Sequence, residues 1–138
     1  MTLDLSSFEK ALQSLLDSID IYSSGLVPIG SSAEKLFRDG IIQRFEYTFE
    51  LSWKMLKRYF EMYGLEKVDT FTNKQFFRLA FEQGLIKNAE VWMGYLQRRN
   101  LTSHVYDEEV ARKVYSTVND FYLDAKVLLA NLRTQISA

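Results

Sequence analysis

Residues 31–64 read SSAEKLFRDGIIQRFEYTFELSWKMLKRYFEMYG. Pro28 and Gly30 mark a loop just before this stretch, and Ser31 with Glu34 three residues later has the pattern of a capping box at a helix start. Gly64 supplies a stop signal at the other end. The pattern predicts one long helix that runs to Tyr63.

Apolar residues fall on two faces of this predicted helix. One face holds Phe37, Ile41, Thr48, Leu51, Met55 and Met62, and the other holds Ile42, Phe45, Phe49, Trp53, Leu56, Phe60 and Tyr63. A helix of a monomeric four-helix bundle needs only one apolar stripe. The second stripe makes this either the most buried helix or a subunit interface, because large exposed apolar patches are uncommon on soluble monomers. We favour a homodimer.

The helical period continues on both sides of the central stretch. The N-terminal helix is predicted from Leu5, Phe8, Leu12, Leu15, Ile19 and Tyr22, which lie three or four residues apart and end near residues 23–25. Thr72 with Gln75 predicts a short third helix that is closed by Gly84. Asn88 and Asp107 can cap a fourth and a fifth helix, of which the fifth is predicted to continue to Leu132.

No alternating apolar segment bounded by turns argues for a sheet, and no internal repeat or linker divides the chain. We therefore expect a single all-α domain over residues 1–138, an antiparallel up-and-down four-helix bundle with one short extra helix.

The composition excludes several kinds of chemistry. The 138 residues include no Cys and one His, so thiolate nucleophiles, Cys-ligated metals and His-rich metal sites are excluded, and we expect no metal site. With 17 Lys and Arg against 18 Asp and Glu, the net charge is −1. The chain as a whole therefore lacks the basic character typical of nucleic-acid-binding domains, and only a local basic patch could bind nucleic acid. The absence of a long apolar run and of a signal segment predicts a cytoplasmic protein without membrane contact.

The single histidine, His104, falls between the fourth and fifth predicted helices in a polar segment, residues 98–107. In one interpretation the segment only ends helices: Arg98 and Arg99 meet the C-terminal dipole of the fourth helix, and Asp107 caps the next. In the other, His104 moves protons and an arginine holds phosphate, which suits metal-free cleavage of RNA. Arg99 and His104 lie about 140° apart on an ideal helix, so they converge only if the helix ends between them.

Two further polar features lie on the long second helix. Glu46, Glu50 and Lys54 form an i, i+4 line, for which we favour a solvated salt-bridge face. Arg44 has Ile41, Thr48 and Leu51 as its helical neighbours, so its guanidinium is either paired inside the bundle or faces a phosphate-binding groove.

Two stretches of the sequence resemble the nucleotidyltransferase substrate-binding proteins, a branch of the HEPN superfamily of helical bundles. They are residues 39–54, DGIIQRFEYTFELSWK, and residues 99–106, RNLTSHVY, and the resemblance covers nearly the whole chain. It implies a homodimeric bundle that forms a hetero-tetramer or larger complex with a small nucleotidyltransferase encoded nearby. ATP and Mg²⁺ are then expected on that partner, and no cofactor is expected on this chain.

The resemblance also implies an alternative function, a metal-independent ribonuclease toxin that acts on RNA. In HEPN ribonucleases an Arg and a following polar residue precede a His, and Arg99, Asn100 and His104 match with four residues between Arg and His. In the toxin branch the nucleotidyltransferase acts as antitoxin by transferring AMP to a tyrosine two places after the His, which here is Tyr106. Arg98 also satisfies the spacing, and we keep it as a phosphate-binding candidate together with Arg44.

Overall fold

The computed structural model describes residues 2–64 and 67–137. Within these ranges the chain forms six α-helices, two 3-10 helices and no strand, so the all-α prediction is confirmed. The α-helices are α1 (Ser6–Ser23), α2 (Ser32–Tyr63), α3 (Asn73–Glu82), α4 (Ala89–Asn100), α5 (Glu108–Tyr115) and α6 (Val118–Ser137). The 3-10 helices are η1 (Val68–Thr70) and η2 (Thr102–His104).

Helix α2 starts and stops where the sequence predicts. The Ser31 hydroxyl accepts a hydrogen bond from the Glu34 backbone N–H at 3.2 Å, which satisfies one of the free donors of the first turn. At the other end a Cβ placed on Gly64 would lie 2.6 Å from the Phe60 carbonyl oxygen. Any larger residue would therefore have to shift the last turn of the helix.

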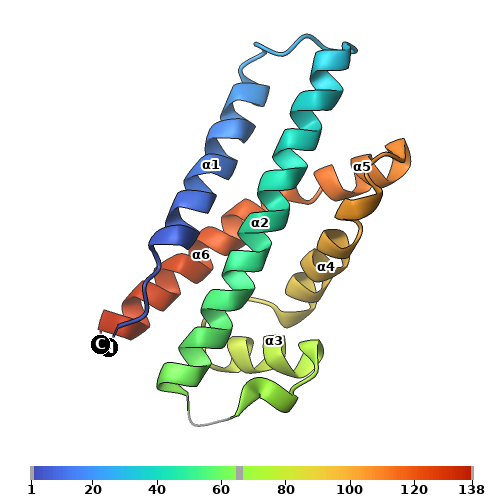
Figure 1. Ribbon diagram of the computed structural model, residues 1–138. Coiled ribbons are helices and arrows are strands. Elements are labelled where there is room, and N and C mark those ends of the chain that lie inside the picture. Colours follow the sequence, from blue (N-terminus) through green and yellow to red (C-terminus); the bar gives the residue numbers. More distant parts are fainter. Residues whose placement is uncertain (1, 65–66, 138) are drawn as a thin grey trace.

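The other helices pack around α2 (Figure 1). Helix α1 lies along one flank of α2 and α4 lies on the opposite flank, while α6 crosses behind α1 and α2. Helix α3 packs against α4 near the C-terminal end of α2. Because α2 contacts α1, α4, α5 and α6, it is the central element of the fold.

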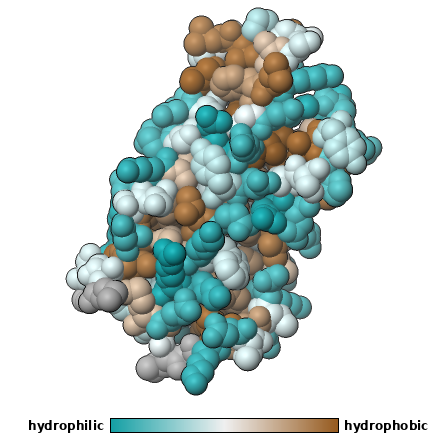
Figure 2. Space-filling view, in the orientation of Figure 1, coloured by the Kyte–Doolittle hydropathy of each residue, from teal (hydrophilic) through white to brown (hydrophobic). Residues whose placement is uncertain are grey.

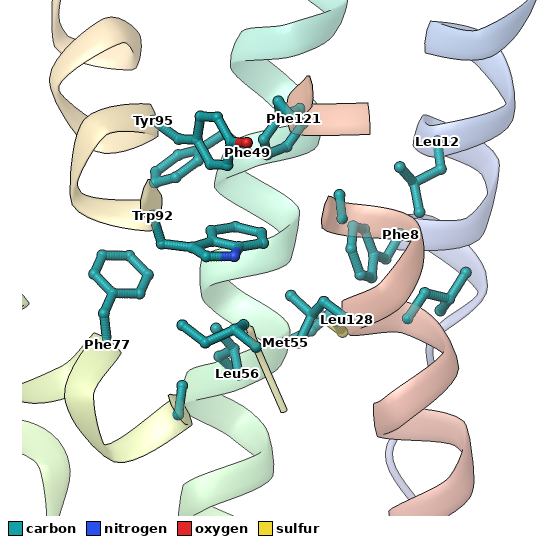
Figure 3. Close-up of a cluster of buried hydrophobic side chains, with 14 of the residues drawn as sticks. Phe8, Leu12, Phe49, Met55, Leu56, Phe77, Trp92, Tyr95, Phe121 and Leu128 are labelled. Atoms are coloured by element: carbon teal, nitrogen blue, oxygen red, sulfur yellow. The ribbon is translucent and has the colours of Figure 1, made fainter. Parts of the chain in front are cut away.

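The centre of the core is a cluster of aromatic rings contributed by three helices (Figure 3). Phe121 of α6 meets Phe45 of α2 edge-to-face, with ring centroids 5.0 Å apart, and Tyr95 of α4 at 5.3 Å. Trp92 of α4 lies 5.8 Å from Phe121. Edge-to-face pairs of this kind add roughly 0.5–1.5 kcal/mol beyond the area they bury. Burial, together with a hydrogen bond to Asp124, raises the pKa of the Tyr95 phenol above its ordinary value.

Both apolar stripes of α2 are used inside the chain. The buried apolar residues of the helix are Ile41, Ile42, Phe45, Phe49, Met55, Leu56 and Phe60. The apolar surplus of α2 is thus explained by its central place in the fold. The homodimer stays a prediction, and it no longer depends on the second stripe.

The prediction of one fifth helix from Asp107 to Leu132 is wrong, because the chain turns between α5 and α6. The Ser116 hydroxyl donates to the Lys113 carbonyl oxygen at 2.8 Å, and the Thr117 hydroxyl donates to that of Val114 at 2.8 Å. Side-chain bonds of this kind compete with the helical backbone pattern. The fold therefore has more and shorter helices than the four-helix bundle with one short extra helix that the sequence predicts.

Three further helix starts, those of α3, α4 and α5, are capped by the predicted residues. Thr72 and Gln75 form a reciprocal capping box at the start of α3. The Asn88 side chain accepts from the Val91 N–H at 3.0 Å to begin α4, and the Asp107 carboxylate accepts from the Glu109 N–H at 3.0 Å to begin α5.

Exposed apolar side chains gather at the end of the molecule where α1 and α2 are joined (Figure 2). Leu26, Ile29 and Leu36 are each at least 74% exposed there. In the described ranges we find no helix with the length and hydropathy that crossing a bilayer requires.

Replacing Phe121 with Ala should lower the free energy of unfolding by about 3–5 kcal/mol, because the ring is fully buried against α2 and α4. The matched change on the same helix, Leu123→Ala, removes a side chain that is 59% exposed and should have an effect of about 0.5 kcal/mol or less. Urea unfolding followed by circular dichroism measures both. Equal losses for the two variants would contradict this account of the core.

Candidate functional site

The polar segment of residues 98–107 connects α4 to α5. Helix α4 ends at Asn100, and the short helix η2 carries His104 in the next turn. The helix therefore ends between Arg99 and His104, which is the condition under which the sequence allows these two residues to converge. No hydrogen bond or aromatic contact joins their side chains within the described part of the chain.

Arg99 is held by a carboxylate from α2. Its Nε lies 2.5 Å from Glu50 Oε1, and both side chains are a little more than one-third exposed. A half-exposed ion pair of this kind contributes about 1 kcal/mol or less to stability. The main effect of Glu50 is thus to orient the Arg99 guanidinium, and not to hold the fold together.

A second contact to α2 lies three residues further along the segment. The Thr102 hydroxyl is within hydrogen-bond reach of the Glu46 carboxylate and of the Arg99 carbonyl oxygen, the latter at 2.7 Å. Thr102 thus links the end of α4 to α2. Because Glu46 and Glu50 are one helical turn apart, they bind the segment at two successive points.

The far end of the segment is tied to the start of α2. Arg38 Nη1 donates to Glu108 Oε1 at 2.8 Å, and the Arg38 side chain is largely buried. This hydrogen bond is the largest cause that lowers the pKa of the Glu108 carboxyl. The turn that carries His104 and Tyr106 is therefore anchored to one helix on both sides.

Between these anchors the reactive side chains face solvent. Asn100 and His104 are exposed, and Tyr106 is 86% exposed. The rings of His104 and Tyr106 lie 6.1 Å apart at a steep angle. The backbone N–H of His104 donates to the Leu101 carbonyl oxygen at 2.9 Å. This hydrogen bond fixes the backbone that carries the imidazole.

The two adjacent arginines have different surroundings. The Nε atoms of both are buried and lack a partner with hydrogen-bond geometry among the described residues. Arg99 nevertheless forms the ion pair with Glu50, whereas no carboxylate oxygen of the described residues lies within 4.0 Å of Arg98. The structure thus gives Arg99 a defined charge partner beside the turn, and Arg98 lacks such an anchor.

Arg44 lies on the side of α2 that faces α1. Its Nε donates to Ser14 Oγ at 3.2 Å and its Nη1 to the Gly40 carbonyl oxygen at 3.0 Å. It lines a hollow of about 460 Å³ between the two helices, with Phe37 and Leu36 among the other lining residues. Arg44 is thus paired with neutral groups at the edge of a groove, and the structure does not bring it to the His104 segment.

Sequence reasoning missed the roles of Glu46 and Glu50. Their i, i+4 line predicts a solvated face, but both carboxylates contact the segment of residues 99–102. The spacing was a real signal of a shared helix face. It could not reveal partners that lie some fifty residues away in the sequence.

The arrangement offers an imidazole, a guanidinium and a phenol around one solvent-facing turn. Across residues 2–64 and 67–137, His, Asp and Glu side chains form no group of three or more that could hold a metal ion. The groups present can transfer a proton, bind a phosphate and act as an oxygen nucleophile.

A protein sequence and a solved structure, both from Haemophilus influenzae, are similar to this chain. One, named probable ribonuclease HepT, is 38% identical over 96 residues, and this match covers 68% of the chain and 66% of that protein. The other is a solved structure, described as the substrate-binding domain of a nucleotidyltransferase, which superposes with a TM-score of 0.85 at 32% identity. That superposition covers 94% of this chain and 99% of the other.

A solved protein from Thermus thermophilus superposes with a TM-score of 0.72 at 35% identity and covers 91% of this chain and 98% of its own. The family model described as nucleotidyltransferase substrate binding protein like matches residues 3–134. Because this match includes every α-helix except the end of α6, the chain belongs to the nucleotidyltransferase substrate-binding protein family.

Proposed function

We propose that this chain is the helical partner subunit of a cytoplasmic two-component complex, in which its homodimer docks a small nucleotidyltransferase. The nucleotidyltransferase binds ATP and Mg²⁺ and supplies the catalytic carboxylates. The complex is a hetero-tetramer or larger, and the substrate that this chain presents is its own Tyr106.

The observation that supports this proposal is the position of the Tyr106 hydroxyl. The side chain is 86% exposed on a turn whose two sides are anchored to α2 through Glu50 and Arg38. An active site on another protein can therefore reach the phenol without unfolding any helix. The fixed turn also reduces the ordering cost of presenting it.

The reaction joins the Tyr106 oxygen to the α-phosphorus of ATP. A new O–P bond forms, the bond between the α-phosphorus and the bridging oxygen breaks, and pyrophosphate leaves with the electron pair. The phenolic proton passes to a base on the partner or to solvent. The product carries AMP, whose charge and bulk then stand beside His104.

Incubation with the partner nucleotidyltransferase, ATP and Mg²⁺ should add AMP to Tyr106, because this hydroxyl belongs to a side chain that is 86% exposed on the turn. Intact-mass and peptide mass spectrometry measure the adduct and its position. Tyr106→Phe should abolish it. The matched change Tyr47→Phe, at another partly exposed tyrosine, should leave it unchanged. An adduct that persists in the Tyr106→Phe variant would contradict the assignment.

A second candidate function, metal-independent RNA cleavage, is favoured by the anchored Arg99. Glu50 holds its guanidinium on the same short connection that exposes His104. Arginine binds phosphate through two parallel hydrogen bonds and stabilises the charge that develops during phosphoryl transfer. Histidine can accept the proton of the ribose 2′-hydroxyl or protonate the leaving 5′-oxygen. Asn100 is exposed one residue after Arg99 and can orient the reacting groups.

RNA cleavage in EDTA should fall at least a hundredfold in His104→Ala and in Arg99→Ala, because general acid–base catalysis and charge stabilisation each contribute about that much or more. Arg98→Ala tests the neighbouring guanidinium and should retain most of the activity. Gel analysis of labelled RNA measures the rate, and circular dichroism checks the fold. Unchanged cleavage in both of the first two variants would remove the ribonuclease candidate.

Glu50→Gln should lower the same cleavage rate by about tenfold to a hundredfold, because Arg99 then loses the charge that orients it. Single-turnover measurements at saturating RNA separate this loss from weaker binding. Glu61→Gln makes the same change at an exposed position of the same helix and should have no effect. Equal rates in the Glu50→Gln variant and the unmodified chain would show that Arg99 does not need Glu50.

A further inference from the structure

Neither candidate function uses the hollow between α1 and α2. Its volume of about 460 Å³ falls within the range of roughly 300–1,000 Å³ that is typical of small-molecule sites. Side chains of α1 line one wall, and side chains of α2 line the other. The two helices lie side by side and run in opposite directions (Figure 1). We call this feature the α1–α2 hollow.

The lining of the α1–α2 hollow changes from polar to apolar along its length. At one end Ser14 of α1 is hydrogen-bonded to Arg44 of α2. Because the helices are antiparallel, Ile21 lies toward the other end, where Leu36 and Phe37 complete the lining. Ile21 is two helical turns beyond Ser14, a distance of about 10 Å along the helix. The hollow therefore has a polar end and an apolar end.

The guanidinium of Arg44 is oriented at the polar end. Its Nε donates to Ser14 Oγ at 3.2 Å, and its Nη1 donates to the Gly40 carbonyl oxygen at 3.0 Å. Both acceptors are neutral, and no carboxylate oxygen of the described residues lies within 4.0 Å of Arg44. Its positive charge is thus held in place and is available to the carboxylate of a ligand, which a guanidinium binds through parallel hydrogen bonds.

Asp17 supplies the opposite charge in the same hollow. It follows Ser14 by about one helical turn and is exposed, and its carboxylate accepts a hydrogen bond from the Gln13 amide at 2.8 Å. In the part of the chain that the structure describes, no cationic nitrogen lies within 4.0 Å of this carboxylate. Asp17 would oppose a simple anion and Arg44 would oppose a simple cation, whereas a zwitterion satisfies both.

The apolar end leaves hydrophobic surface open to a ligand. Ile21 is 43% exposed and Leu36 is 74% exposed. Leu36 belongs to the exposed apolar side chains at the end of the molecule where α1 and α2 are joined (Figure 2). Covering this surface removes it from water and therefore favours the binding of an apolar group.

We propose that the α1–α2 hollow binds a free α-amino acid with a bulky apolar side chain. The ligand's α-carboxylate pairs with Arg44, its α-ammonium group pairs with Asp17, and its side chain lies against Ile21 and Leu36. Since the α-carbon joins all three groups, one small molecule can satisfy all three parts of the lining.

A second copy of the chain is the competing occupant, because Arg44 of one copy could pair with Asp17 of the other and the reverse. Such reciprocal pairing would set one hollow against the other and leave a cavity between the copies, so the concave shape favours a small molecule. The proposal does not rest on the function proposed above, because neither Tyr106 nor His104 lines the hollow.

The test is an NMR titration of the ¹⁵N-labelled full chain with L-phenylalanine. Chemical-shift changes should be confined to the lining of the hollow, with a Kd on the order of 0.1–1 mM for a ligand of this size. Three related compounds each lack one of the three groups. N-acetyl-L-phenylalanine lacks the ammonium group, L-phenylalaninamide lacks the carboxylate and glycine lacks the apolar side chain. Each should bind about tenfold more weakly or worse.

Matched variants assign the two charges. Arg44→Gln should weaken the binding of L-phenylalanine by about tenfold or more, whereas Arg58→Gln, at an exposed position of the same helix, should not change it. Asp17→Asn should weaken the binding of L-phenylalanine and tighten that of N-acetyl-L-phenylalanine, because the charge that opposes an anion is lost. Asp20→Asn is the control on the same helix and should change neither.

The opposite effects of Asp17→Asn on the two ligands cannot come from a general loss of structure. Because Asp17 is exposed, this variant also keeps the proposal testable when circular dichroism shows that Arg44→Gln does not fold. The amino-acid titration needs no nucleotidyltransferase and no RNA. Its failure leaves the AMP-transfer and ribonuclease candidates untouched, and their failure leaves the titration result standing.

Three results would overturn the proposal. They are no binding of L-phenylalanine at about 10 mM, equal affinities for L-phenylalanine and N-acetyl-L-phenylalanine, and equal weakening by Arg44→Gln and Arg58→Gln. Light scattering after size-exclusion chromatography tests the competing occupant. A dimer that dissociates in both Arg44→Gln and Asp17→Asn, in a chain that binds no amino acid, would assign the hollow to a second copy.

Discussion

One long helix with two apolar faces sets the arrangement of every other element. Helix α2 cannot leave either face in water, so α1 and α6 cover part of it and α4 and α5 cover another part. The edge-to-face contacts of Phe121 with Phe45 and Tyr95 join these layers at the centre. The polar side chains Arg38, Glu46 and Glu50 of α2 hold the segment with His104.

The features that the sequence predicts correctly are local ones. Ser31, Thr72, Asn88 and Asp107 cap helices because each side chain bonds to a backbone N–H two or three residues away. The turn after Tyr115 is also local but escapes prediction, since Val114, Val118 and Phe121 keep the helical period across it. Periodicity reports which residues are buried, and a sharp turn between two helices can preserve that pattern.

The residues of the candidate site can be proposed from the sequence, but the contacts on α2 that hold them in place cannot. Arg99, Asn100, His104 and Tyr106 stand close together in the sequence, so a short motif can identify them. Their anchors on α2 are separated from them by 49–70 residues and need the folded chain. Because the pair of Arg99 with Glu50 is half-exposed, a phosphate can approach this guanidinium from solvent while Glu50 keeps it oriented.

The contribution of α6 to the core has a consequence for protein synthesis. Phe121, Leu128 and Leu132 are completely buried, and they belong to α6, which leaves the ribosome after the other described helices. Until α6 emerges, the face of α2 that it covers has no partner, so we expect the contacts of Glu46 and Glu50 with residues 99–102 to be looser. We therefore expect the turn with His104 to reach its final geometry only after α6 has been made and has packed against α2.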